Sequence, residues 1–593
     1  MGLALGVALA AFYRAAFTDG LTSGTVSNFL ELKWATAALA GALWAVLLAT
    51  GRLTAAAVRL TAIDAALAAL VAWAVVSLLW TPDPAAAALS GLFAGIALLI
   101  YLLARCTAPD ALLRILVVAA GGLLVASLVS RAVFGTAVDL GFGNENFAAE
   151  TLVLCACVLP LASRQPAAPL RWFIGAACAL AILYLLLLAR SNLQYLALLA
   201  GLWYLALRLF PARLGIVLTI LLAGAAIGGV AQAIGDDPAR FARLPLGWQE
   251  RVQVWSNVAA GIADAPLRGH GWGSFYHVYA EYIDRYLSFA PGLGLPAFDS
   301  FERSAGAGHN ELLEIWFLLG LPGVLLALLI GVLAVAGALR APRDTVAGWT
   351  GLGLVAWLAM AMIEFPGQNA ASAVLALLFL ALVVPVCPLP VRLGTVTPGR
   401  ILPIGAALAA TALAVPAFVQ VQAQNRFAAA DLLHKAGRLG PSADAMGPAL
   451  ETSSLAPKLR LRLYPQSIVA GLPYWNQAGI PELERRFAVS ASAAPHHPVL
   501  LDLRLKFLLA LTDPPAAEVE AALAALKVTS GLSNANAHVL DAAWALRTGD
   551  RPRAQASLTL AEARLAANPI AVSAANNRAN TAALQQQLNA ANR

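Results

Sequence analysis

Charged side chains are scarce in this sequence. Only 12% of its 593 residues are Asp, Glu, Lys or Arg, whereas 60% are hydrophobic. Soluble domains carry about a quarter charged residues, so this composition argues against a soluble enzyme and predicts a polytopic membrane protein. The net charge of +7 is accounted for by arginines in the loops between spans, and binding to nucleic acid is not indicated.

Cysteine is also scarce, and its placement excludes one class of fold. The five cysteines lie in or beside apolar segments, at Cys106, Cys155, Cys157, Cys178 and Cys387. None falls in the polar loop 235–308 or after residue 420, so no external disulfide framework is expected. Cys155 and Cys157 are two residues apart and point to different faces of a helix, which argues against a metal pair.

Motifs for metal and nucleotide chemistry are missing. The sequence has no Asp-x-Asp pair, no His/Cys cluster and no Gly-x-x-x-x-Gly-Lys loop. Divalent cations prefer clustered oxygen ligands, and phosphate-binding loops need that glycine spacing. We therefore expect no metal, no nucleotide hydrolysis and no cofactor.

Long apolar segments are abundant instead. A membrane-spanning helix needs about 20 mostly apolar residues. The first candidate is short, carries Arg14 and lacks a basic region before it, so it does not resemble a cleavable signal peptide. Thirteen candidate spans lie at 2–17, 34–50, 61–80, 85–104, 112–130, 147–163, 172–189, 193–207, 214–234, 311–339, 345–363, 370–387 and 401–419.

Basic residues are distributed unevenly between the two sets of loops. Alternate short loops contain only Lys33, Arg131 and Arg190. The cytoplasmic side of a membrane protein collects lysine and arginine, so the N-terminus is expected in the cytoplasm and the loop 235–308 outside. The other set has two arginines in each of six loops, namely Arg52, Arg59, Arg105, Arg114, Arg164, Arg171, Arg208, Arg213, Arg340, Arg343, Arg392 and Arg400.

The predicted fold class is all-α, a transmembrane bundle of about twelve to thirteen spans in residues 1–419. Its external loop, 235–308, is far longer than the other connections, which makes it a candidate functional element. The loop contains two amphipathic pieces, 248–264 and 274–288. Their aromatic and apolar faces suit helices lying at the membrane surface.

Residues 420–593 are more polar and predict a soluble helical domain on the external side. The segment from Trp544 to Pro569 has a helix, a Gly-Asp turn, an alanine-spaced helix and a terminating Asn-Pro, as in tetratricopeptide hairpins. An Ala-Ala-Pro at 493–495 is similar to the Ala-Ala-Asn-Pro that ends this segment and lies about two repeat lengths before it. Such arrays bind partners, so this domain could bind a protein. The tail beyond Ala571 could be a lone helix or disordered.

Polar residues at the external ends of spans are the candidates for function, because charge at bilayer depth is costly and usually marks a site. Arg190 occupies a short hairpin with Ser191, Asn192 and Gln194, and capping of the preceding helix is its alternative role. Asn146 follows Asn144 and Glu145 at the start of the sixth span, where it could cap the helix or contact a ligand.

Glu150 lies one turn inside the same span and needs a partner, for which Arg131 or Arg190 is the expected kind. In the long loop, Arg251 and Trp255 share one helical face. A solubilising role for Arg251 is equally compatible with that position.

A glycine-rich stretch, APLRGHGWGSF at 265–275, follows in the loop. Its glycines at 269, 271 and 273 allow another segment of backbone to approach closely. A glycine-rich turn is by itself a weak functional signal.

His309 begins the tenth span and is the candidate base. The helix dipole and the arginines expected nearby favour its neutral form, which can accept a proton. Asn310 and Glu314 are one turn apart, so Glu314 is expected to orient Asn310 or to pair with an arginine. Pro322 removes a backbone donor and Gly320 and Gly323 permit close packing, which predicts a kinked or broken helix, GHNELLEIWFLLGLPG at 308–323.

Arginines that converge at the external surface predict an anion site, and a diphosphate suits guanidinium groups well. In this sequence His309-Asn310, followed after nine residues by Gly320-x-x-Gly323, resembles the signature of the O-antigen ligase and polysaccharide polymerase superfamily. The Arg-x-x-x-Trp at 251–255, the arginine hairpin at 190 and Asn-Glu-Asn-Phe at 144–147 fit the same pattern. The resemblance covers about residues 130–385.

The resemblance implies a metal-independent glycosyltransferase of the bacterial inner membrane, acting at its periplasmic face. It implies undecaprenyl diphosphate as the carrier of the glycan donor, and lipid A core, another lipid-linked glycan or a protein serine as acceptor. His309 would be the catalytic base, and Arg190 and Arg251 would bind the diphosphate. The hairpin reads Arg-Ser-Asn-Leu instead of the commoner Ser-Arg-Gly, which makes the role of Arg190 less secure.

Two other classes of function stay open. A transporter of lipid-linked glycans would need polar residues at several depths, and Asp64 is the sole deep acidic candidate, near a cytoplasmic helix end. An assembly scaffold would act through residues 420–593.

Overall fold

The computed structural model describes residues 30–134, 145–162, 193–209, 246–282, 307–342, 345–386, 395–435, 497–529, 535–567 and 574–591, with a few isolated positions between them. Nearly all of these residues are helical, as the composition predicts. The expected spans at 2–17 and 214–234, and most of the one at 172–189, lie outside the described residues.

The apolar part of the chain is a bundle of long helices. Three stretches are long and apolar enough to cross a membrane, Pro84–Arg105, Glu311–Arg340 and Ile401–Gln420, and six shorter apolar helices accompany them among the described residues. The expected total of twelve to thirteen spans stays a prediction. The helices are α2 (Leu30–Ala49), α3 (Ala62–Ser77), α4 (Pro84–Arg105), α5 (Pro109–Phe134), α6 (Glu145–Ala162), α8 (Leu193–Leu209), α14 (Glu311–Arg340), α15 (Val346–Met360), α16 (Ala370–Val383) with the 3-10 turn η4 (Val384–Val386), and α17 (Ile401–Lys435).

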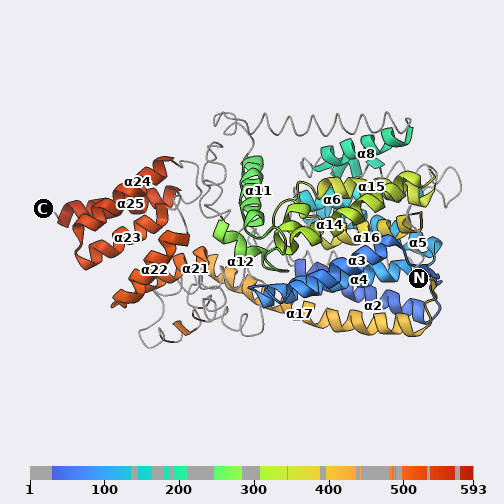
Figure 1. The fold of residues 1–593 in the computed structure, drawn as a ribbon, viewed down its shortest axis with the longest axis horizontal. Helices are drawn as coiled ribbons and strands as arrows, with labels where there is room; N and C mark the ends of the chain where they lie inside the picture. The colour runs from blue at the N-terminus through green and yellow to red at the C-terminus, as the bar shows by residue number, and fades with distance from the viewer. Residues whose placement is uncertain are drawn as a thin grey trace.

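Segments far apart in sequence lie side by side in this bundle (Figure 1). Helix α17 runs along α2, α14 along α3, and α15 packs between α16 and α8. Small residues allow the closest approach: a side chain at Gly351 of α15 would collide with Ala338 of α14. The buried hydroxyl of Tyr204 on α8 donates to the carbonyl oxygens of Ala338 and Gly348, at 3.0 and 2.9 Å, and so joins α8 to both helices.

One end of the bundle is closed by a short sheet and a buried ion pair. Strands β1 (Val58–Arg59) and β2 (Thr395–Val396) pair antiparallel there. Asp64 completes a capping box with Thr61 at the start of α3 and lies 3.2 Å from the guanidinium of Arg105. The hydroxyl of Tyr101 donates to the same carboxylate at 2.7 Å. These contacts give Asp64 a structural role. Asp64 is the deep acidic residue that the sequence analysis noted as a candidate for a transporter.

The long loop covers the other end. It contains α11 (Leu246–Asp264), the short helix α12 (Phe275–Tyr279) and the 3-10 turn η2 (Ala280–Tyr282). Helix α11 packs on α14. Trp272 accepts a hydrogen bond at its carbonyl from Thr81 and donates its N–H to Ser77, both at 3.0 Å. Of the helix expected at 274–288, α12 and η2 cover the part up to Tyr282, and the rest lies outside the described residues.

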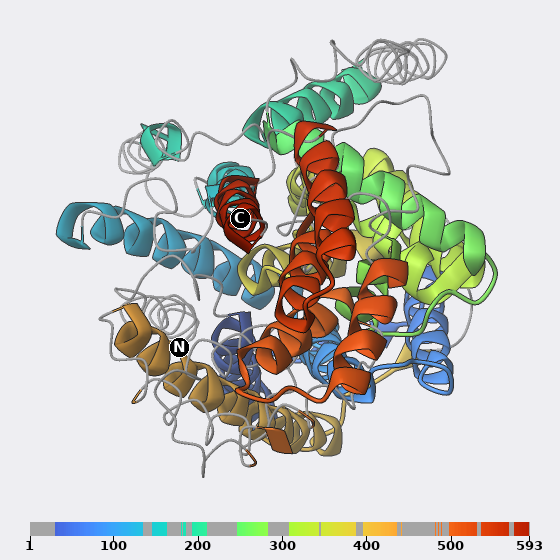
Figure 2. The same ribbon diagram turned by 90° about the vertical axis from the view of Figure 1, so that its left-hand side faces the viewer.

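The C-terminal helices lie beyond the loop helices at this same end (Figures 1 and 2). Helix α17 continues without a break to Lys435, so the expected domain boundary at 420 falls inside a helix. Two helices joined by a turn at Gly549 (φ +82°) occupy the segment predicted as a hairpin, and its tetratricopeptide type stays a prediction. The tail is a helix whose Leu588 packs on its neighbours. The helices are α21 (Pro498–Ala510), α22 (Ala516–Thr529), α23 (Ala535–Thr548), α24 (Arg551–Ala567) and α25 (Ala574–Ala591).

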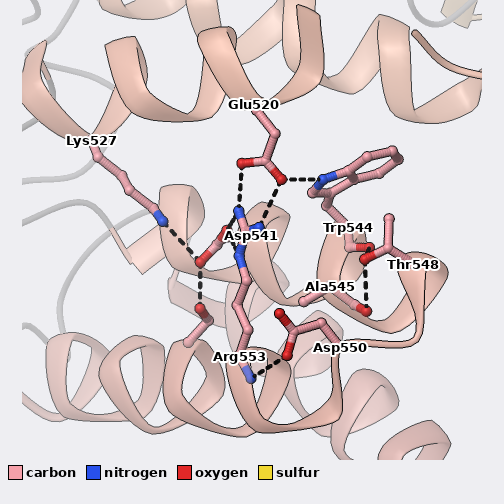
Figure 3. A network of polar contacts seen from close by, with 9 residues as sticks. Glu520, Lys527, Asp541, Trp544, Ala545, Thr548, Asp550 and Arg553 are labelled. Atoms are coloured by element: carbon pink, nitrogen blue, oxygen red, sulfur yellow. Dashed lines mark hydrogen bonds and ion pairs between the residues drawn. The ribbon is translucent and has the colours of Figure 1, made fainter. Parts of the chain in front are cut away.

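A polar network ties three of these helices together (Figure 3). The buried carboxylate of Asp541 on α23 accepts hydrogen bonds from Arg553 of α24 at 2.6 Å and forms an ion pair with Lys527 of α22 at 2.9 Å. Arg553 also reaches Glu520 at 2.7 Å, and that carboxylate accepts from the indole of Trp544. Burial opposes ionisation of Asp541, but Ser557, Lys527 and Arg553 outweigh it and lower the pKa of this carboxyl.

Candidate functional site

The polar start of α14 is explained by the hairpin that links α15 to α16. Asn310 caps α14 by accepting from the Leu313 N–H at 3.0 Å, and its amide donates to the carbonyl of Met362 at 2.8 Å. The N–H of Glu311 donates to the carbonyl of Ala361 at 2.9 Å. Residues that make a costly beginning for a membrane helix thus bind a second segment, residues 361–369.

Two glutamates of α14 complete this attachment. Glu311 accepts from the Gly367 N–H at 2.8 Å. Glu314 accepts from the Gly308 N–H at 2.7 Å and from the side chain of Gln368 at 3.2 Å. Among the described residues, backbone and amide donors of the two loops hold the Glu314 carboxylate, so neither expected role, orienting Asn310 or pairing with an arginine, is seen there.

His309 lies between these loops and faces Glu364 of the hairpin. Its Nδ1 is 3.1 Å from Glu364 Oε2. Glu364 is 1% exposed, whereas the side chain of His309 is 33% exposed, so an incoming group can reach the imidazole but not the carboxylate. A carboxylate only accepts, so Nδ1 carries the proton and Nε2 is the nitrogen that can take one.

Arg251 of α11 binds the other oxygen of the same carboxylate. Its Nη2 donates to Glu364 Oε1, and its Nε donates to the carbonyl of Ile363 at 3.1 Å. Burial alone would raise the pKa of Glu364, but the hydrogen bond and charge of His309 and the charge of Arg251 outweigh it, and the pKa lies below its usual value. The three side chains form one row, Arg251–Glu364–His309, called the triad below.

Three further groups fix the triad in position. The amide of Asn146 on α6 donates to Glu364 Oε1 at 2.7 Å, and the indole of Trp255 donates to the carbonyl of His309 at 3.1 Å. Phe365 meets the imidazole edge-on, with ring centroids 4.9 Å apart. Arg251 and Trp255 therefore act from one face of α11, as their spacing predicts.

The break in α14 lies in the helix that follows His309, and its backbone groups are bound by other segments. Gly320 has φ +66° and interrupts the helix, as predicted from Pro322. The carbonyls of Phe317 and Leu318 accept from the N–H groups of His270 and Gly271, both at 2.9 Å. The carbonyl of Leu319 accepts from the indole of Trp73 at 2.7 Å. The glycine-rich stretch of the long loop therefore replaces the hydrogen bonds that the break removes.

Close approach of backbone explains the glycines of that stretch. Gly269, Gly271 and Gly273 all have positive φ. An added Cβ would collide with the Leu318–Gly320 backbone at Gly269 and with Thr81 at Gly271. His270 lies between them against Phe317, where burial lowers its pKa and keeps the ring neutral.

Glu150 lies about one turn inside α6, with none of its surface exposed. Asn369, which directly precedes α16, and Ser372 of α16 donate to its Oε2 at 3.2 and 3.3 Å. Its Oε1 has no hydrogen-bond partner among the described residues. The partners seen are therefore an amide and a hydroxyl, whereas an arginine was expected; the side chains of Arg131 and Arg190 lie outside what the structure describes.

The predicted site residues that hydrogen-bond to one another or to the 361–369 hairpin are Asn146, Arg251, Trp255, His309, Asn310 and Glu314. Arg190 and Asn144 lie outside the described residues. Glu364 was missed. The criterion that singled out Arg190, a charged residue in a short connection between two apolar segments, also applies to Glu364 and could have found it.

No group of three or more His, Cys, Asp or Glu side chains that could hold a metal ion occurs among the described residues. No protein-family model and no curated protein matches this chain. The superfamily resemblance stays a prediction that rests on the motifs themselves.

Proposed function

We propose that this chain is a glycosyltransferase that moves a glycan from undecaprenyl diphosphate to an acceptor hydroxyl at the periplasmic face of the inner membrane, without metal or cofactor. The observation that carries the proposal is the triad. Side chains from three distant segments meet there, and the imidazole, which can exchange a proton near neutral pH, is the most exposed of the three.

The triad suits a base that activates a hydroxyl group. Glu364 holds the proton of His309 on Nδ1, so Nε2 removes the proton of the acceptor hydroxyl as its oxygen attacks the anomeric carbon. The new carbon–oxygen bond forms as the bond to the diphosphate breaks, and the electron pair leaves with the diphosphate. Attack from the side opposite the leaving group inverts the anomeric configuration.

Charge on the leaving diphosphate needs cations close by. Arg251 and His309 contact the two different oxygens of the Glu364 carboxylate. Arg190 is the second guanidinium implied by the resemblance. Arg251 also holds Glu364, so its loss would weaken both the leaving group's site and the base.

The arrangement of loops supports the orientation. The Arg105 ion pair and the β1–β2 sheet occupy one end of the bundle, whereas α11, α12 and the C-terminal helices occupy the other (Figure 1). Basic loops favour the cytoplasm. The triad belongs to the opposite end, which is the periplasmic side in this proposal.

The acceptor defines three versions of the enzyme. A ligase would use lipid A core, a polymerase another lipid-linked repeat, and an oligosaccharyltransferase a protein hydroxyl. The C-terminal helices, with their tetratricopeptide-like hairpin, favour the versions that need a partner surface. A deletion strain separates them: complete chains stranded on the carrier indicate a ligase, single repeats a polymerase, and an unglycosylated protein the third.

One observation favours a transporter of lipid-linked glycans. Glu150 is a fully buried carboxyl with an oxygen that lacks a partner in the described part of the chain, which is typical of ion-coupled transport. A flipping assay with lipid preloaded in one leaflet decides between them. Transfer without flipping supports the enzyme, and flipping without transfer supports the transporter.

The enzyme is tested with full-length protein in vesicles that contain a lipid-diphosphate-linked glycan and an acceptor. His309→Ala should abolish transfer, and Glu364→Gln should lower kcat on the order of 10²- to 10⁴-fold because the imidazole loses its orienting acceptor. Glu562→Gln, at an exposed position of α24, is the matched control. Full transfer by folded His309→Ala protein would refute the mechanism.

A further inference from the structure

His497 joins the C-terminal helices to the long loop. It immediately precedes α21, and its ring stacks on Tyr276 of α12 with centroids 5.9 Å apart and planes within 11°. It also meets His277 edge-on at 6.4 Å. The residue is 1% exposed. Through this contact α21 is seated beside α12 and η2, as their neighbouring positions in Figure 1 indicate.

The imidazole of His497 is an unusual group for such a contact. Neither of its ring nitrogens makes a well-formed hydrogen bond to a described residue, and the Tyr276 backbone is the polar group that acts on the ring most directly. A buried polar group without such a bond is destabilising, and a phenyl ring would fill the same space without that cost. Burial and the neighbouring His277 lower the pKa of His497 to about 3, against a smaller opposing effect from the Tyr276 backbone.

The surroundings offer little compensation for a charge on His497. The carboxylate of Asp83, just before α4, is buried and lies 4.0 Å from Nδ1 of His277, the histidine that His497 meets edge-on. On η2, Glu281 is exposed and Tyr282 is buried. A proton on His497 would therefore place a buried cation beside a second histidine that already faces the one buried acid.

We propose that His497 is an acid-sensitive latch, which seats the C-terminal helices on α12 as a neutral imidazole and releases them when it is protonated. In the released state the ring lies in water, where histidine has a pKa near 6.5. The released state therefore binds more protons than the seated state below that pH. Seating is strongest above pH 6.5 and weakens as the pH falls from 6.5 toward 3.

The size of the effect follows from one proton. The seating equilibrium falls about tenfold per pH unit below 6.5, which is about 30-fold between pH 7.5 and pH 5. Helix α12 directly follows the glycine-rich stretch that binds the break in α14, so release loosens the segment that holds this break. The latch does not depend on the proposed glycan chemistry, because seating is measured without substrate.

Hydrogen exchange measures seating in the full-length protein in lipid nanodiscs. After correction for intrinsic rates, protection of the amides of α12 and of the first turn of α21 should fall about 30-fold from pH 7.5 to pH 5. His497→Phe should keep its pH 7.5 protection at pH 5. His538→Phe is the matched control, because burial lowers the pKa of His538 on α23 as well, and it should retain the 30-fold fall.

Two results would overturn the latch. One is protection in the wild-type protein that does not change with pH. The other is the same fall in His497→Phe as in the wild type. If the phenyl ring fails to seat, seen as low protection already at pH 7.5, His497→Gln provides a non-titrating side chain of similar polarity for the same comparison.

Discussion

At the residue scale, His309, the residue proposed to transfer a proton, has an unfavourable backbone conformation. Its φ is +48°, the one positive value outside glycine in the described part of the chain. A left-handed conformation costs an L-residue on the order of 1–2 kcal/mol. This backbone conformation lets the imidazole face Glu364 while the next residue, Asn310, caps α14. The imidazole is thus held immediately before the first turn of α14.

This strain predicts an order of stability among inactive variants. His309→Gly and His309→Ala both remove the imidazole, but glycine adopts positive φ without strain, which offsets its greater entropy loss on folding. We expect His309→Gly to be as stable as His309→Ala or up to about 1 kcal/mol more stable. Thermal unfolding in detergent measures the difference, and a clearly more stable alanine variant would contradict it.

The carboxyl of Glu364 predicts how acid acts on the triad. Its folded-state pKa lies below its ordinary value of 4.5. The unfolded chain therefore takes up protons first as the pH falls, so the stabilisation is complete above about pH 4.5 and is lost below it. The stability difference between the wild type and Glu364→Gln should be constant from pH 8 to pH 5 and shrink in more acidic buffer. A difference that grows below pH 5 would contradict this.

At the element scale, the break in α14 depends on donors from elsewhere. Trp73 of α3 donates its indole N–H to the Leu319 carbonyl, whereas the indole nitrogen of nearby Trp80 has no hydrogen-bond partner among the described residues. Trp73→Phe should therefore cost about 1–3 kcal/mol and Trp80→Phe distinctly less. Urea unfolding of both variants in the same detergent provides the comparison, and equal losses would refute the role given to Trp73.

The same element shows how far sequence reasoning reaches. Pro322 with Gly320 predicts the break, because one lacks a donor and the other tolerates positive φ. Glycines at 269, 271 and 273 predict close approach. Neither pattern identifies the two as partners, since hydrogen bonds between segments about fifty residues apart leave no periodic signal. The missed pairing of Glu364 with Asn146 and Arg251 has the same cause.

At the scale of the whole molecule, the C-terminal helices have a stabilising centre of their own. Asp541 binds Arg553 and Lys527, whose side chains are only partly buried. Asp541→Asn should destabilise this domain by about 2 kcal/mol, less than for a fully buried pair because solvent screens both cations. Asp513→Asn, at an exposed position, should have little effect. Calorimetry of the full chain should show the loss in the C-terminal transition alone.

The whole-molecule plan was largely accessible from the sequence. Hydropathy predicts the apolar bundle, and the drop in hydropathy near 420 predicts the helices that follow. The unbroken course of α17 to Lys435 was not accessible, because helix continuity across a polarity change depends on packing that composition does not encode. The seating of α21 through His497 was missed for the same reason.

The glycines at 269 and 320 face each other so closely that a methyl group on either one would meet the backbone of the other's segment. Whichever is replaced first forces the two strips of main chain apart, and the second replacement then enters space already opened. The stability lost in the double variant should therefore be well below the sum of the losses in the two single variants. Once evolution has replaced one of these two glycines, a substitution at the other is less costly. The two positions should therefore change together among related proteins.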